Sequence, residues 1–297
     1  MAKEPRSIQG RVIAITGGAR GIGKATAKAL VARGGKVAIG DIDRELAEQA
    51  AAEVGGGTLA LELDVTARDS FAGFLDQVEE RLGSLDVLVN NAGIMPIGRF
   101  VDEDDQTAHR MVDINVHGVL LGMKLALPRM QRRGSGHLVN LASQAGKAGL
   151  PGGATYCGTK HFVVGVSEAV RAELRGSGIE VSCVMPGVVN TELGSGLREA
   201  RAIKKTEPED VAEAIVAALE RPKFDVYVPR ESVVAYKLGA ILPRRASEAL
   251  ARLLKGDEVL AQADQAARAG YEQRAARSTA AEAERSAEAE AEKSVAN

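Results

Sequence analysis

Short apolar runs alternate with stretches of helical periodicity over the first 230 residues of the chain. The runs are rich in Val, Ile and Leu and alternate poorly with polar residues, which is typical of strands buried on both faces. We predict strands over Val12–Thr16, Lys36–Gly40, Thr58–Leu63, Val87–Asn90, His137–Leu141, Glu180–Val184 and Asp225–Val228. Helices are predicted between them, over Gly21–Arg33, Arg44–Val54, Ala67–Leu82 and Pro208–Leu219.

This β-α-β rhythm predicts an α/β fold of the Rossmann type. We expect a doubly wound parallel sheet of about seven strands with helices on both faces, formed by residues 8–230. Beyond it, residues 231–270 are expected to form a helical extension, with helix-compatible segments Glu231–Leu242 and Ala246–Leu254. Residues 271–297 are rich in Ala and Glu, and we expect a disordered or loosely helical tail there.

Composition and charge narrow the class of protein. The chain has 297 residues, of which 45% are hydrophobic and 26% charged, as in ordinary globular domains. A formal net charge of -2 argues against a general nucleic-acid binder, which needs a basic surface. Cys157 and Cys183 form no metal or disulfide pattern, and no apolar stretch is long enough to cross a bilayer. We expect a cytoplasmic protein without a secretory signal.

The segment TGGARGIG follows the first predicted strand and opens a helix. A tight turn needs positive φ or close backbone approach, which Gly17, Gly21 and Gly23 permit. The helix N-terminus that follows, at Ile22, offers free N–H groups to a pyrophosphate. The context is that of a dinucleotide site, although the spacing is GxxxGxG and not GxGxxG.

Asp41 ends the second predicted strand, where a carboxylate can bind the adenosine ribose and repel a 2′-phosphate. This favours NAD, with NADP as the alternative. Arg20 argues weakly for NADP, because its guanidinium could pair with a 2′-phosphate. Asp41 could instead cap the helix near Arg44. At the end of the third strand, Asp64 and Val65 are expected at the adenine, a role compatible with helix capping by Asp64.

Several further motifs follow in order: Asn90-Asn91-Ala92-Gly93, Asn115, Ser143, Tyr156-x-x-x-Lys160 and Pro186-Gly187. Together with TGGARGIG and Asp64-Val65, they resemble the short-chain dehydrogenase/reductase family over roughly residues 8–230. The resemblance implies NAD(P)-dependent oxidation of alcohols or reduction of carbonyls. It also implies a homodimer or homotetramer, for which Asp104–Met123 and Ala154–Arg175 are candidate interface helices.

The residues themselves support proton transfer. A free tyrosine has a pKa near 10, so only about one part in a thousand is ionised at pH 7. Lys160 lies one helical turn after Tyr156, and its ammonium would favour the phenolate. Ser143 follows a strand at the ligand-binding edge and can donate to the substrate oxygen. Without the other motifs, Tyr156 would be an ordinary half-buried aromatic and Lys160 a solvated charge.

Other roles rest on the resemblance alone. It implies that Lys160 binds the nicotinamide ribose and that Asn115 supports a water-linked proton path, although Asn115 could equally bend or cap a helix. Asn90 and Gly93 should line the cofactor groove, whereas Asn91 is expected to be mainly structural, and Thr191 should meet the nicotinamide carboxamide. The remaining residues expected at the cofactor are Ala92, Tyr156, Pro186, Gly187 and Val189.

The segment after Pro186-Gly187 is predicted to form a substrate-side loop. Gly194 and Gly196 suggest a movable lid. The apolar residues around it favour a fairly hydrophobic alcohol or ketone, although core packing would use the same types: Met95, Leu150, Val188, Leu193, Leu197 and Ile203. The four histidines, His109, His117, His137 and His161, show no metal-binding spacing. We expect no catalytic metal, because Tyr156 and Lys160 already supply the acid–base function.

Two other classes of function remain open. A catalytically silent, dinucleotide-sensing protein could share this fold, but it would not need Tyr156, Lys160 and Ser143. The apolar C-terminal segment with Lys237, Arg244 and Arg245 could instead contact a membrane surface or a partner. We expect it to cover the pocket or another subunit.

Overall fold

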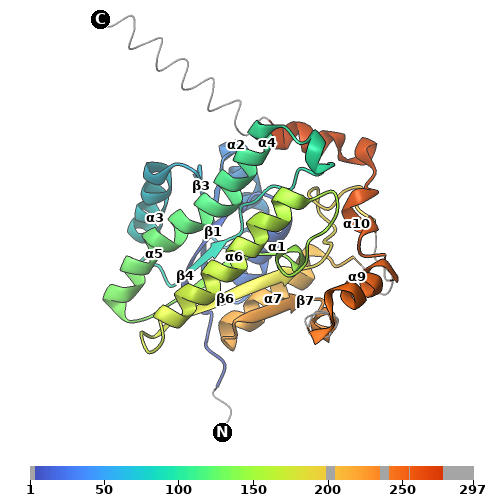
Figure 1. The fold of residues 1–297 in the computed structure, drawn as a ribbon. Helices are drawn as coiled ribbons and strands as arrows, with labels where there is room; N and C mark the ends of the chain where they lie inside the picture. Colours follow the sequence, from blue (N-terminus) through green and yellow to red (C-terminus); the bar gives the residue numbers. More distant parts are fainter. Residues whose placement is uncertain (1–3, 199–204, 235–240, 254, 277–297) are drawn as a thin grey trace, which may run out of the picture.

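Within the described residues, one parallel sheet holds seven strands in the order β3-β2-β1-β4-β5-β6-β7. The computed structural model describes all residues except 1–3, 199–204, 235–240, 254 and 277–297. The strands are β1 (Val12–Thr16), β2 (Lys36–Asp41), β3 (Leu59–Glu62), β4 (Val87–Asn90), β5 (Gly136–Leu141), β6 (Ile179–Pro186) and β7 (Asp225–Val228). The predicted Rossmann-type fold is confirmed (Figure 1).

Helices cover both faces of the sheet and enclose two apolar cores. One core lies between the sheet and α3, α5 and α6, and the other lies between the sheet and α1, α2 and α7 (Figure 1). The helices are α1 (Gly21–Val31), α2 (Arg44–Val54), α3 (Arg68–Leu82), α4 (Asp105–Val112), α5 (Gly118–Arg133), α6 (Ala154–Glu173), α7 (Pro208–Glu220), α9 (Arg244–Leu253) and α10 (Glu258–Ala261). Shorter helical turns are η1 (Phe100–Asp102), η2 (Asp113–His117) and η3 (Gln144–Gly146).

The predicted strands agree with the observed ones to within two residues at each end, as do the four predicted helices. Local chemistry explains this agreement. The strands are buried runs of branched apolar residues, as in β1, where all five residues are buried. Pro208 occupies the first turn of α7, and Asp210 accepts a hydrogen bond from the backbone N–H of Glu207 at 2.9 Å, closing the helix start.

The C-terminal extension differs more from the prediction. Of the segment Glu231–Leu242, residues 232–234 are helical and residues 235–240, including Lys237, lie outside the described residues. The tail was expected to begin at residue 271. Residues 265–276 form one helix, here called the C-terminal helix, and residues 277–297 lie outside the described residues. Tyr271 is half-buried and Ala275 is buried, so contacts with the domain keep this part helical. No helix in the described ranges is long and apolar enough to span a membrane.

Candidate active site

An open cavity of about 690 Å³ lies along the carboxyl ends of the strands. It is bordered by residues at or just after the ends of β1, β2, β4, β5 and β6, including Gly17, Asp41, Asn91, Ala142 and Gly187. The strand order reverses between β1 and β4, and in open α/β sheets ligands bind in the crevice at such a point. The cavity is therefore the candidate site.

The glycine turn forms one wall and leaves room for a phosphate group. Gly17 and Gly21 have φ of +63° and +48°, which other residues rarely adopt. A Cβ on Gly17 would also lie 2.9 Å from Cα of Ala92. Among the described residues, no side chain caps the N-terminus of α1, so its first N–H groups are free for an anion. These features fit the diphosphate of a dinucleotide.

Asp41 is held by backbone N–H groups at the end of β2. Its carboxylate accepts hydrogen bonds from the backbone of Ala19 at 3.1 Å and of Asp43 at 3.4 Å. The alternative role as a helix cap belongs instead to Asp43, which accepts from the N–H of Leu46 at 3.0 Å. Burial raises the pKa of Asp41, and the two backbone hydrogen bonds oppose that shift. Asp41 lines the cavity, where a ribose could reach it.

The residues expected at the adenine and those expected after β4 in the cofactor groove differ in position. Asp64 and Val65 line the cavity, and Asp64 also accepts from the N–H and hydroxyl of Thr66, at 2.8 and 2.7 Å, which fixes the turn before α3. Asn90 was predicted to line the groove but does not: it is buried below it and donates to Oδ1 of Asn140 at 2.8 Å. Asn91 lines the cavity instead.

Asn91 also has the structural role that we expected. Its side-chain amide donates to the backbone carbonyls of Thr16 and Gly17, both at 2.9 Å. These bonds join the end of β4 to the glycine turn after β1. Asn91 therefore fixes the shape of the phosphate-binding wall.

Tyr156 and Ser143 come together from different elements. Tyr156 lies in the first turn of α6, and Ser143 follows β5 and precedes η3. Burial raises the pKa of Tyr156 to about 12, whereas hydrogen bonding with the Ser143 side chain acts in the opposite direction. The Ser143 hydroxyl accepts from the N–H of Ala145 at 3.1 Å, which fixes its position. Both hydroxyls lie at the cavity, where a substrate oxygen could contact them.

Lys160 is buried beside Tyr156. Its ammonium donates to the carbonyl of Leu141 at 2.9 Å and lies 5.8 Å from the centre of the Tyr156 ring. Burial lowers the pKa of Lys160 to about 8. Among the described residues, no carboxylate forms a salt bridge with it, so its charge is left for a ligand or for the ionised tyrosine.

Asn115 lies in a π-helical turn, η2, between α4 and α5. Its side chain accepts from the N–H of Ile94 and donates to the carbonyl of Ile94, both at 2.9 Å, and donates to Thr159 at 3.1 Å. A Cβ on Gly93 would lie 3.1 Å from Oδ1 of Asn115 and 3.5 Å from Nζ of Lys160. Gly93 thus keeps the space between the two side chains open, and π-turns of this kind are frequent at functional sites.

The loop after β6 forms a further wall of the cavity. Pro186, Gly187, Val189 and Thr191 line the cavity, as predicted for the cofactor side. The expected substrate-side residues Met95, Leu150, Val188, Leu193 and Leu197 line it too, whereas Ile203 lies outside the described residues. Gly23 and Asn115 are not among the residues that line the cavity: a Cβ on Gly23 would clash with the carbonyl oxygen of Gly17, and Asn115 is fully buried.

The C-terminal extension supplies wall residues that the sequence did not reveal. Residues that line the cavity from this region are Gly256, Val259, Leu260, Tyr271, Arg274 and Ala275. Val259 and Leu260 pack with Met95 and Leu197 in a separate apolar cluster, so the extension covers the pocket as we expected. Beyond residue 270, the sequence feature that could have indicated a packed segment was Tyr271. The residues around it are rich in alanine and charged side chains, so composition alone could not distinguish this segment from a solvated tail.

Comparison with known proteins places this site in a family. Residues 11–202 match the short chain dehydrogenase family. The chain is 38% identical over 230 residues to 2-(S)-hydroxypropyl-CoM dehydrogenase 3 of Xanthobacter autotrophicus, covering 71% of this chain and 90% of that protein.

Two solved structures are similar over three quarters of the chain or more. The 3-ketoacyl-(acyl-carrier-protein) reductase of Brucella melitensis, complexed with NADH, has a TM-score of 0.71 and 30% identity, covering 75% of this chain and 99% of that one. A short chain dehydrogenase/reductase of Burkholderia phymatum has a TM-score of 0.73 and 23% identity, covering 79% and 94%. At this identity, the similarity to the Burkholderia phymatum structure shows a common fold.

Proposed function

The chain belongs to the short-chain dehydrogenase/reductase family of oxidoreductases, and we propose that it interconverts an alcohol and a carbonyl compound with NAD as its cofactor. The observation that carries this proposal is that Tyr156, Ser143 and Lys160 line the same cavity as Asp41 and the uncapped N-terminus of α1. The nicotinamide ring, when bound, supplies the acceptor or donor of hydride.

Each catalytic side chain has a role that follows from its surroundings. Ser143 donates a hydrogen bond to the substrate oxygen and holds that oxygen beside Tyr156. Tyr156 removes the hydroxyl proton during oxidation and returns it during reduction. Lys160 stabilises the phenolate through its charge, and it can also bind the ribose of the cofactor. Asn115, fixed by Ile94 and Thr159, borders the space through which a proton would reach Lys160.

Asp41 supports NAD over NADP. Its carboxylate is fixed by Ala19 and Asp43, so it cannot easily turn away from a 2′-phosphate. Arg20, by contrast, is engaged with Glu192 at 3.3 Å and with Asp43 at 3.7 Å. The NADH in the similar Brucella melitensis reductase is consistent with this preference.

The substrate is proposed to be a fairly hydrophobic alcohol or ketone, because the pocket near Tyr156 is lined by Met95, Leu150, Leu193 and Leu197. The relative from Xanthobacter autotrophicus is named for a substrate with a hydroxypropyl group. An alcohol dehydrogenase reaction on a secondary alcohol is therefore a reasonable starting point for a search.

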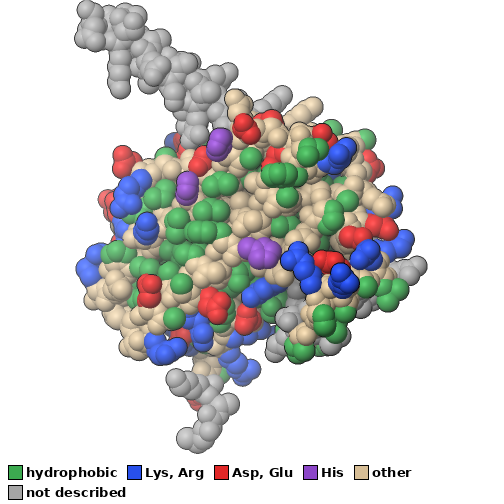
Figure 2. Space-filling model, viewed as in Figure 1, with side chains coloured by type: hydrophobic (Ala, Val, Ile, Leu, Met, Phe, Trp, Pro, Cys, Tyr) green, Lys and Arg blue, Asp and Glu red, His purple; other side chains and the backbone are tan. Residues whose placement is uncertain are grey.

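We also propose a homodimer or homotetramer. Figure 2 shows hydrophobic side chains gathering over α5 and α6, and Phe162 on α6 is 38% exposed. The sequence nominates Asp104–Met123 and Ala154–Arg175 as interface segments; the first includes the start of α5 and the second includes all of α6. Light scattering on purified protein should give two or four times the mass of the 31.1 kDa chain.

The proposed reaction is tested by calorimetric titration with NAD and NADP, followed by a panel of secondary alcohols with the cofactor that binds. Formation of reduced cofactor, read by its absorbance, supports the proposal. Failure of both cofactors to bind would contradict it. Binding with no turnover across the panel would instead support a dinucleotide-sensing protein.

A further inference from the structure

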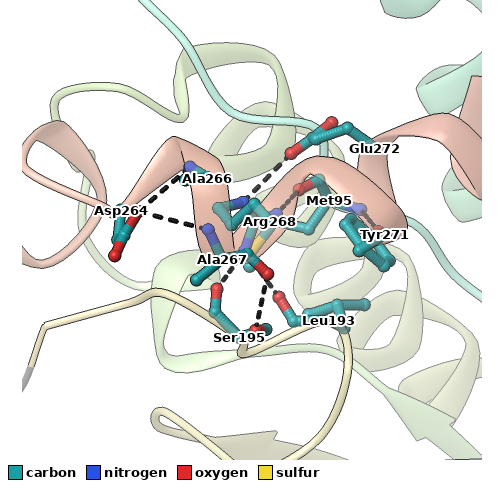
Figure 3. Close-up of polar contacts among 9 residues, drawn as sticks. All are labelled: Met95, Leu193, Ser195, Asp264, Ala266, Ala267, Arg268, Tyr271 and Glu272. Atoms are coloured by element: carbon teal, nitrogen blue, oxygen red, sulfur yellow. Dashed lines mark hydrogen bonds and ion pairs between the residues drawn. The ribbon is translucent and has the colours of Figure 1, made fainter.

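The C-terminal helix, residues 265–276, is fixed over the cavity by a buried arginine (Figure 3). Arg268 is fully buried and donates to three backbone carbonyls: Leu193 at 2.9 Å, Ser195 at 3.0 Å and Met95 at 2.8 Å. Its guanidinium also pairs with Glu272 at 3.0 Å, one turn along the helix. The helix is thereby joined to both the substrate-side loop and the segment after β4.

Further contacts fix the helix along its length. The hydroxyl of Tyr271 accepts a hydrogen bond from the N–H of Met95 at 2.6 Å (Figure 3). Arg110 of α4 donates to the carbonyl of Ala275 at 3.2 Å. Arg274 lies between these two contacts in the sequence and lines the cavity. The position of its backbone is therefore set by its neighbours on both sides.

One carboxylate holds Arg274 together with an arginine of the glycine turn. Oε2 of Glu192 lies 2.9 Å from Nη2 of Arg274 and 3.3 Å from Nη1 of Arg20. The three side chains are 53%, 44% and 42% exposed, respectively, so a ligand in the cavity can reach them. Ion pairs this exposed add little to stability, and exchanging their partner therefore costs little.

The ion pairs of Glu192 with Arg20 and Arg274 lie next to the position proposed for the diphosphate. Thr191, the residue before Glu192, is so close to the turn that a Cβ on Gly21 would lie 3.1 Å from its Cγ2 atom. Gly21 is the first residue of α1, whose N-terminus is not capped by any described side chain. The carboxylate of Glu192 therefore holds two guanidiniums beside the place where the N–H groups of α1 would receive a diphosphate.

We propose that Arg274, carried over the groove by the C-terminal helix, joins Arg20 in binding the diphosphate of the dinucleotide, and that Glu192 occupies both guanidiniums until the cofactor replaces it. Arg274 can have this role only if the chain binds a dinucleotide, as the proposed function states. Guanidiniums bind phosphate oxygens through paired, charge-assisted hydrogen bonds, and a diphosphate carries two negative charges where Glu192 carries one. A diphosphate that replaces the Glu192 carboxylate therefore balances the charges of the two guanidiniums more fully.

Calorimetric titration of the full chain with NAD, NADP and adenosine tests this role without relying on turnover. Arg274→Gln should weaken NAD binding by about tenfold, as expected for the loss of a charge-assisted hydrogen bond. Binding of adenosine, which has no phosphate, should not change. Arg274→Lys should restore part of the loss. Arg252→Gln removes the same charge from an exposed position on α9 and should bind NAD as the wild type does.

For Glu192→Gln, the proposal predicts a change in NAD affinity opposite to that of Arg274→Gln. Without its charge, the side chain competes less for Arg20 and Arg274, and NAD should bind more tightly than to the wild type. Thermal unfolding of each variant checks that the fold is intact.

The outcomes separate this role from the proposed function. Equal NAD affinity in Arg274→Gln and Arg252→Gln would overturn the role of Arg274, and no gain in Glu192→Gln would overturn that of Glu192. A loss confined to NADP would assign Arg274 to a 2′-phosphate and would also overturn the proposal. A wild-type chain that binds neither dinucleotide would contradict the proposed function itself, and this role with it.

Discussion

The ammonium of Lys160 lies 5.8 Å from the centre of the Tyr156 ring, one turn further along α6. Both side chains are buried, and burial favours the neutral form of each: it raises the pKa of Tyr156 to about 12 and lowers the pKa of Lys160 to about 8. An ammonium at this distance favours a phenolate over a phenol. The attraction between the two side chains is therefore strongest when Tyr156 is ionised, which is the state that alcohol oxidation requires.

The first prediction concerns the pH dependence of oxidation. Because Tyr156 must lose its proton to act as a base, the oxidation rate should rise with pH, and Lys160→Met should move this rise to higher pH by about one unit or more. Reduction needs the protonated phenol and should not share the rise. Initial rates from pH 6 to pH 10 measure the shift, and an unchanged profile in the variant would argue against the role of Lys160.

Asp41 should control the choice of cofactor. Asp41→Asn keeps an oxygen for the N–H of Ala19 but removes the charge that repels a 2′-phosphate. We expect the ratio of kcat/KM for NADP over NAD to rise about tenfold, equivalent to about 1.4 kcal/mol. Asp41→Ala should give at least the same rise. If both variants keep the wild-type ratio, discrimination lies elsewhere in the groove.

Arg268 should be essential for the order of the C-terminal helix. Arg268→Met removes the donors to Met95, Leu193 and Ser195 and leaves the buried carbonyl of Met95 and the part-buried carbonyls of Leu193 and Ser195 without this partner. We expect a loss of about 3 kcal/mol in the free energy of unfolding, measured in urea, and faster proteolysis within residues 256–276.

Arg252→Met is the matched control for this change. It removes an arginine that donates only to the carbonyl of Glu248 in the described contacts and is exposed, so its effect should stay within about 0.5 kcal/mol. Similar stability losses in the two variants would show that the buried contacts of Arg268 are not what holds the helix.

His137 should make the fold sensitive to acid. It is buried against Ser182 at 2.9 Å, and burial lowers its pKa to about 3 from an ordinary value of 6.5. Below pH 6.5 the unfolded chain binds a proton that the folded chain does not, so stability falls with falling pH. From pH 7 to pH 5 the contribution is about 2 kcal/mol.

His137→Gln keeps a hydrogen-bonding side chain for Ser182 without a group that titrates in this range. Urea unfolding at pH 7 and pH 5 should therefore show a smaller loss in the variant than in the wild type. An equal loss would mean that other groups cause the acid sensitivity.

The sequence predicted those parts of the site that depend on local patterns. Strand ends, the glycine turn and the Tyr156-x-x-x-Lys160 spacing all follow from residues that are neighbours in the chain. Asn90, expected at the groove, is instead buried and donates to Asn140, which lies 50 positions later in the chain, a contact that no local pattern encodes. The capping role considered for Asp41 belongs to Asp43, which directly precedes the first residue of α2.

The C-terminal helix could not be predicted for a different reason. Arg268 is buried because it contacts the carbonyl of Met95, which lies 173 positions earlier in the chain, and no local pattern encodes that contact. Alone, its segment has the composition of a solvated helix. Tertiary contacts with the cavity walls determine its position.

The central claim is that Tyr156 transfers the proton in an NAD-dependent reaction. The most direct test compares wild type and Tyr156→Phe in calorimetric NAD binding and in the rate of reduced-cofactor formation with an alcohol that the wild type oxidises. The account predicts NAD affinity within about twofold of the wild type and a rate at least about 100-fold lower, the usual contribution of a general base. A variant that binds NAD and turns over at the wild-type rate would contradict it.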